Sequence, residues 1–180
     1  KGGWYFDAIA HQEPIDDDNL KLEDNVEEFV PIKDEEMEHF RCEADRLYNE
    51  TDKAILADFG GTSFGDIAMV PAAWLKHPKG IRGIEEWYIS TVTRTDFIYE
   101  IFAYQSEVGL KNLEKLYNVV GDKATAIFVT GTDFGTQNAP FIAPQLYRDL
   151  FQPFHIQINN WIHKNTPWKS WIHSCGSVRL

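Results

Sequence analysis

The chain alternates between short apolar runs and longer segments in which apolar residues recur at helical spacing. Three runs, at 53–59, 124–130 and 169–173, are apolar on both faces, which predicts buried β-strands. Short buried strands separated by helices are typical of a parallel sheet. We therefore predict an α/β fold.

Helices are predicted before and between these strands. Asp34 can cap a helix that runs to about Asn49, because acidic residues fill its first turn. The longest helix is predicted at 95–120 and ends at Gly121, since glycine favours helix ends. Further helices are predicted at 71–76, at 83–91 and at 144–164, the last interrupted at Pro153.

The first 33 residues are acidic and lack a clear periodicity. Residues 1–52 hold 17 acidic and 5 basic side chains, whereas the rest of the chain holds 11 and 12, for a net charge of −11. We expect 1–33 to be a mostly irregular surface segment with a short strand at Gly2–Asp7. The lack of a basic stripe argues against a nucleic-acid partner.

Length and composition favour a single domain over residues 1–180. Hydrophobic residues make up 43% of the chain, which is enough for a packed core. Two cysteines, Cys42 and Cys175, are too few for a disulfide framework and fit a reducing cytoplasm. No run approaches the roughly 18 apolar residues of a membrane span, so no membrane partner is expected. Because the chain opens on Lys1 instead of Met, we expect it to be trimmed.

Polar or ionisable side chains follow each predicted strand. They are Asp58, Asp133 and the pair His173 and Cys175. The carboxyl ends of parallel strands lie on one side of a sheet and form the site in such folds. We therefore expect Asp133 to be a catalytic carboxylate, although it could instead only bond the amides of its own turn. Asp58, Phe59 and Gln137 are the candidates for substrate binding.

His173 and Cys175 form the strongest candidate metal site. In extended backbone, side chains two apart point to the same side, and an imidazole nitrogen with a thiolate suits zinc. The alternative is an ordinary strand-end pair whose histidine bonds the backbone. Two ligands do not complete a zinc site, so a third must come from elsewhere. His155 and His163, on the last predicted helix, are expected at the surface.

Two stretches resemble the uroporphyrinogen decarboxylase superfamily, which includes the cobalamin-dependent methyltransferases. The stretch from Gly131 to Arg148, GTDFGTQNAPFIAPQLYR, is similar to a strand-loop-helix motif of the superfamily. The sequence His173-Ser174-Cys175-Gly176 resembles the H-x-C-G of the methyltransferase branch. The likeness extends from about Trp4 to the end of the chain.

The resemblance implies a TIM (β/α)8 barrel of roughly twice this length, so that this chain would be an N-terminal and central portion, a partial barrel, and inactive alone. It implies transfer of a methyl group from a corrinoid, carried on a partner protein, or from a similar donor to a small-molecule thiol. His173 and Cys175 match two ligands of the zinc that binds this thiol. The third ligand, a later cysteine, lies outside the chain.

Two other functions stay open. A uroporphyrinogen decarboxylase, a carboxy-lyase of tetrapyrrole (heme) biosynthesis, carries an arginine-rich substrate motif near its N-terminus. Nothing here matches that motif, and an acidic segment would repel a substrate with many carboxylates. The other alternative is a non-enzymatic relative that binds a small ligand at the barrel mouth.

Overall fold

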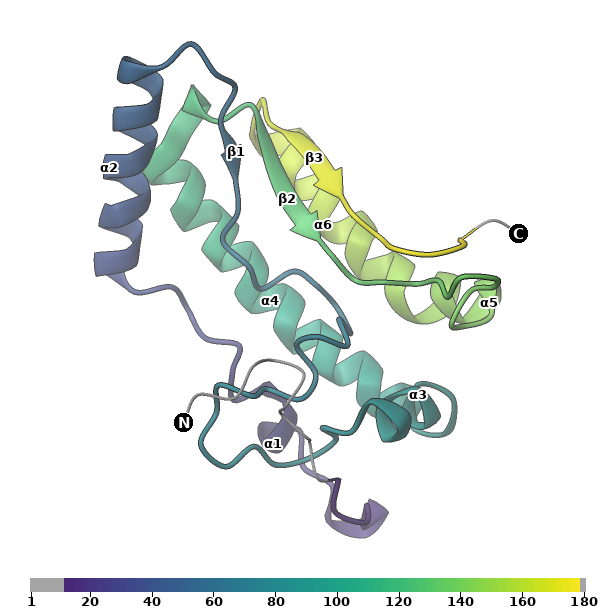
Figure 1. Cartoon of the computed structure of the whole chain (residues 1–180). Helices are drawn as coiled ribbons and strands as arrows, with labels where there is room; N and C mark the ends of the chain where they lie inside the picture. The colour runs from purple at the N-terminus through teal and green to yellow at the C-terminus, as the bar shows by residue number, and fades with distance from the viewer. Residues whose placement is uncertain (1–11, 179–180) are drawn as a thin grey trace, which may run out of the picture.

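The computed structural model describes residues 12–178 and has an α/β fold with a three-stranded parallel sheet (Figure 1). The strands are β1 (Leu56–Ala57), β2 (Ala126–Thr130) and β3 (Lys169–Ile172), with β2 in the middle. The prediction of an α/β fold with parallel strands is confirmed. Over residues 12–178 the sheet is small and open, and it does not close into a barrel.

Most of the predicted helices are present with similar bounds. They are α2 (Asp34–Glu50), α3 (Ile84–Thr93), α4 (Thr95–Val120), and α5 (Pro144–Leu146) with α6 (Gln152–Asn165). Helix α4 ends where Gly121 adopts a φ of +59° and its N–H donates to the carbonyl of Tyr117. None of the described helices combines the length and the apolar composition that crossing a membrane requires.

A π-helical turn, η4 (Tyr147–Phe151), joins α5 to α6. The N–H of Gln152 bonds to the carbonyl of Tyr147, five residues back, instead of four. The next residue, Pro153, has no N–H to offer a regular ladder. The interruption predicted at Pro153 therefore takes the form of a widened turn directly before the proline.

One face of the sheet is covered by helices. Helices α4 and α6 run against this face of the sheet (Figure 1). Ile127 and Val129 of β2 are 0% and 2% exposed and belong to the hydrophobic core. Phe128, between them, points to the opposite face because side chains alternate along a strand. Its ring packs edge to face on Trp171 of β3, with centroids 5.2 Å apart. Phe128 and Trp171 thus mark the uncovered face.

Helix α4 carries most of the core. Its buried side chains recur every three or four residues, which lets one stripe contact the sheet and the neighbouring helices. Phe102, fully buried, is the centre of an aromatic cluster with Phe64, Trp87, Phe151 and Phe154, at centroid distances of 5.1 to 6.0 Å. This cluster joins α3, α4 and α6 to the loop that follows β1.

Three local predictions are wrong. Residues 71–76 form turns instead of a helix, and Ala72 has a φ of +45°, which a helix does not allow. The first strand covers only Leu56–Ala57, not 53–59. The apolar run at 169–173 predicts a buried strand, but Trp171 and Ile172 are 48% and 47% exposed. Apolar side chains allow a strand to be buried, but burial also requires a neighbouring element that covers them.

The acidic segment before α2 is folded over residues 12–33. It contains two short helices, η2 (Asp17–Asn19) and α1 (Glu23–Val26). The Asn25 side chain accepts from the N–H of Ile81 and donates to its carbonyl, each at 3.0 Å. These bonds tie the segment to the loop before α3. The strand predicted at Gly2–Asp7 lies outside the described residues.

A buried ion pair strengthens the same junction. Arg82 is 3% exposed, and its Nη1 and Nη2 lie 2.7 and 3.2 Å from the two carboxylate oxygens of Glu28. The guanidinium also donates to the carbonyls of Asp24, Val70 and Lys79. A bidentate pair with further acceptors compensates the desolvation of both charges.

Replacing Glu28 tests this junction. Glu28→Ala should lower the free energy of unfolding by about 3–5 kcal/mol, because it leaves Arg82 buried without a counter-charge. Glu107→Ala is the control; Glu107 pairs with Lys111 on an exposed face of α4, so its loss should leave stability almost unchanged. Denaturant titration followed by circular dichroism measures both. Equal effects would contradict the anchoring role.

Candidate metal centre and adjoining cavity

Three potential metal ligands converge beyond the carboxyl ends of β2 and β3. They are Asp133, His173 and Cys175, and one ligand atom of each lies within 4.8 Å of the others. His173 Nε2 is 3.1 Å from Cys175 Sγ and 3.9 Å from Asp133 Oδ1. Asp133, predicted as a catalytic carboxylate, is therefore a neighbour of the predicted His–Cys pair.

The strands explain this convergence. The N–H of His173 donates to the carbonyl of Thr130 at 2.9 Å, so the parallel pairing continues just past β3. Trp171, His173 and Cys175 are two residues apart in turn, and that spacing places them on the uncovered side of the sheet. The Cys175 N–H donates to Asp133 Oδ1 at 2.6 Å, which ties the loop after β2 to the segment after β3.

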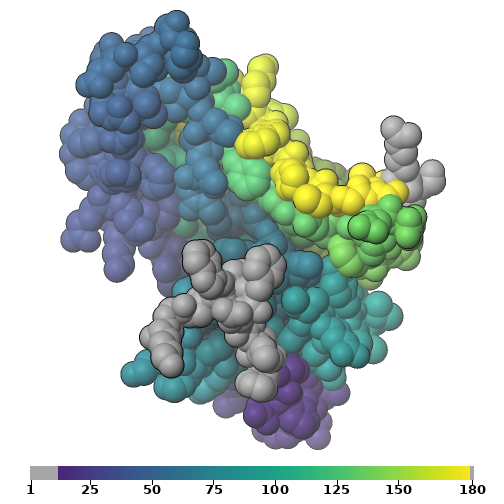
Figure 2. All heavy atoms as spheres, in the orientation of Figure 1, coloured from purple at the N-terminus to yellow at the C-terminus, as the bar shows by residue number. Residues whose placement is uncertain are grey.

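Two glycines allow the loops to touch. Gly176 has a φ of +84°, and a Cβ there would lie 2.0 Å from the carbonyl oxygen of Gly135. A Cβ on Gly135 would lie 2.6 Å from the nitrogen of Ser177. The Ser177 N–H donates to the carbonyl of Thr136 at 2.7 Å. In Figure 2 the C-terminal segment accordingly lies against the loop that follows β2.

The centre is open to solvent and unevenly charged. The side chains of His173 and Asp133 are 51% and 34% exposed, and Cys175 is also exposed. The Asp133 carboxylate raises the pKa of the Cys175 thiol, because it favours the protonated thiol through hydrogen bonding and repels the thiolate. The thiol is therefore protonated at neutral pH unless a cation is present.

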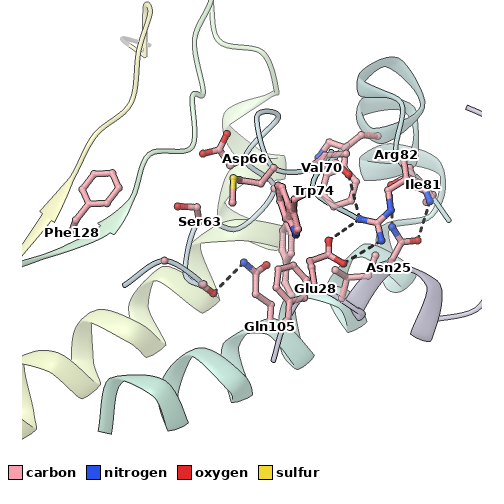
Figure 3. Close-up of a pocket in the computed structure, with 18 of the residues that line it drawn as sticks. Asn25, Glu28, Ser63, Asp66, Val70, Trp74, Ile81, Arg82, Gln105 and Phe128 are labelled. Atoms are coloured by element: carbon pink, nitrogen blue, oxygen red, sulfur yellow. Dashed lines mark hydrogen bonds and ion pairs between the residues drawn. The ribbon is translucent and has the colours of Figure 1, made fainter. Parts of the chain in front are cut away.

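A cavity of about 330 Å³ lies at the end of β1, between the loop over residues 58–82 and α4 (Figure 3). Figure 3 shows Ser63 and Asp66 on the side nearest Phe128, and Arg82 paired to Glu28 on the other side. Most of the wall is apolar or aromatic. It includes Phe29, Met69, Val70, Trp74, Ile81, Trp87, Ile101 and Phe102.

Three polar groups here are in unusual environments; Asp66 and Trp87 line this cavity, and Tyr88 does not. Burial raises the pKa of Asp66, and repulsion from Asp133 raises it further. Burial and the same two carboxylates raise the pKa of Tyr88 to about 12. The indole Nε1 of Trp87 is buried and has no hydrogen-bond partner among the described residues. The Asp133 carboxylate of the ligand cluster therefore acts on the pKa values of both Asp66 and Tyr88.

The predicted substrate-binding residues are scattered. Asp58 lines the cavity, and its Oδ1 accepts from the N–H of Gly60 at 3.2 Å. Phe59 is partly buried and packs against the core. Gln137 is exposed, on the loop after β2. Asp66 and Trp87 also line the cavity but were not predicted from the sequence, although Asp66 directly follows the glycine-containing stretch after β1.

Comparison with models of protein families finds no match to this chain. No curated protein and no solved structure matches it either.

The glycine contact gives a paired prediction. Gly176→Ala should lower the free energy of unfolding by about 2–4 kcal/mol, because it adds a backbone clash to the strain of a positive φ. Gly60→Ala, at a φ of +70° with nothing within 4 Å, should cost only about 1 kcal/mol. Thermal or denaturant unfolding measures both. Equal losses would show that the loops do not meet as closely as described.

Proposed function

We propose that the chain is part of a zinc-dependent methyltransferase of the uroporphyrinogen decarboxylase superfamily, with a TIM-barrel architecture completed outside these residues. The activity is transfer of a methyl group from a corrinoid, or from a similar donor, to a small-molecule thiol. The observation that carries the proposal is the convergence of Asp133, His173 and Cys175 at the carboxyl ends of parallel strands.

The donor set fits zinc. Nitrogen, sulfur and carboxylate oxygen are all zinc ligands, and ligands of a tetrahedral zinc lie about 3.3–3.8 Å apart. The distances of 3.1 and 3.9 Å from His173 Nε2 to Cys175 Sγ and Asp133 Oδ1 need only small side-chain adjustments. Asp133 would take the third protein position, in place of the later cysteine that the resemblance implies.

Zinc would supply positive charge that keeps a coordinated thiol deprotonated. The protein side chains have complementary roles. Asp133 and Cys175 hold negative charge opposite the ion, while Asp133 also accepts from the backbone of Cys175 and so fixes the loop. The high exposure of His173 leaves room for a substrate sulfur at the remaining position. The largely apolar cavity at the end of β1 can hold the rest of a small organic thiol.

A decarboxylase of tetrapyrroles is less well supported. Its substrate carries many carboxylates and requires free cations. Among the described residues that line the cavity, Arg82 is the cation, and Glu28 and three backbone carbonyls already occupy its guanidinium. Asp58 and Asp66 add negative charge to the same wall. These contacts favour a thiol over a polycarboxylate.

Metal analysis tests the centre. Wild-type protein should bind one zinc ion, and Cys175→Ser and Asp133→Asn should each weaken zinc binding by about tenfold to a hundredfold or more. Cys42→Ser is the matched control, because Cys42 lies on the exposed surface of α2, bonded to Glu38. Mass spectrometry and competition with a chromophoric chelator measure content and affinity. Equal zinc in all four proteins, or none in the wild type, would contradict the centre.

Turnover tests the reaction itself. With methylcobalamin and 2-mercaptoethanol, zinc-loaded protein that contains the complete barrel should show loss of the methylcobalamin spectrum, and Cys175→Ser should abolish it. Metal-independent decarboxylation of uroporphyrinogen would instead support the alternative. Zinc binding without either reaction would support a non-enzymatic relative.

A further inference from the structure

A second cavity, of about 410 Å³, lies between the segment after β3 and the helical stretch α5–η4–α6. Its apolar wall includes Phe134, Ile142, Ile172 and Val178. None of the three clustered metal ligands lines it, although Ser174, between two of them, does. The cavity is therefore a neighbour of the metal centre with its own set of side chains.

His155 gives this cavity a buried polar group without a partner. The sequence suggests a surface histidine, but His155 is only 5% exposed because α6 turns it toward Phe64 and Phe134. Its Nδ1 lies 3.2 Å from the hydroxyl of Tyr147, while Nε2 has no hydrogen-bond partner among the described residues. A buried polar atom left in this way costs free energy, which a ligand or water recovers.

The charge of the cavity is opposite to that of the chain. Among the described residues, Arg148 is the charged residue that lines it, and no aspartate or glutamate does. Within residues 12–178 the Arg148 guanidinium has no ion pair, whereas the other arginines Arg41, Arg46, Arg82 and Arg94 are each paired with carboxylates. In a protein with a net charge of −11, an unpaired arginine beside an acid-free cavity favours an anion.

The π-helical turn brings the polar groups to one place. The Gln152 N–H bonds to the carbonyl of Tyr147, five residues back, and both residues line the cavity. Single π turns inside α-helices occur frequently at functional sites. Burial lowers the pKa of His155 to about 4, so the ring is neutral at physiological pH and can use Nε2 as a donor when Tyr147 bonds Nδ1.

We infer that this cavity binds a small monocarboxylate with an apolar body. Arg148 takes the carboxylate, His155 Nε2 and Gln152 offer further hydrogen bonds, and the apolar wall covers the rest of the ligand. Arginine matches a carboxylate with two parallel hydrogen bonds, and such charge-assisted bonds are strong. The site is separate from the proposed zinc centre and does not depend on it.

Benzoate is the probe, because it joins a carboxylate to an apolar ring, and benzyl alcohol is its neutral counterpart. In an NMR titration of the whole chain, benzoate should shift the amides of residues 134–155 and 172–178 and bind at least tenfold more tightly than benzyl alcohol. Arg148→Met, which keeps the apolar stem, should weaken benzoate about tenfold to a hundredfold. Lys164→Met, at the far end of α6, makes the same charge change and should leave affinity unchanged.

Two further measurements make the result decisive. His155→Phe keeps a ring and removes Nε2, so it should also weaken benzoate binding. Circular dichroism confirms that this variant folds. If His155→Phe does not fold, the Arg148→Met variant, at an exposed position, carries the test. The titration is repeated with a zinc chelator, because carboxylates also bind zinc. Retained binding supports the separate cavity whether or not zinc binds. Binding lost with the chelator, equal affinity for Arg148→Met, or no binding would overturn the inference.

Discussion

The parallel pairing of β2 with a strand on each side is the constraint on which the rest of the structure depends. It brings the three carboxyl ends to one edge, so the loops over residues 58–82 and 131–143 and the segment after 172 start from neighbouring points. Helices α4 and α6 make this pairing possible by burying Ile127 and Val129 on the covered face. The candidate metal centre and both cavities lie beyond that edge or beside it.

Close backbone contact turns this edge into a site. Gly135 and Gly176 approach until neither can carry a side chain, and the Cys175 N–H reaches the Asp133 carboxylate. The loop after β2 and the segment after β3 are therefore one structural unit, although 40 residues separate Phe134 from its hydrogen-bond partner Ser174. The acidic group that raises the pKa of the Cys175 thiol is the group best placed to share a cation with it.

Charge is distributed so that the two cavities favour different ligands. In the cavity at the end of β1, Arg82 is neutralised by Glu28, and Asp58 and Asp66 remain. In the cavity beside η4, Arg148 has no acidic neighbour among the described residues of the wall. The thiol that we propose as substrate carries no carboxylate to meet the acidic groups of the first cavity, and the carboxylate that we propose as ligand would meet a cation in the second. The acidic N-terminal segment contributes to the first through Glu28, so its charge also has a structural role.

The sequence by itself determined the α/β class, the order of the three strands and the longer helices, and the His173–Cys175 pair, because periodicity, glycine stops and two-residue spacing are local properties. It did not determine that Asp133 joins the pair, that His155 is buried, or that Trp171 and Ile172 are half exposed. Those facts depend on which segments meet in space: a loop contact between Gly135 and Gly176, a π turn before Pro153, and the presence or absence of a packing neighbour. Such contacts join residues far apart in the chain, and only the tertiary structure decides them.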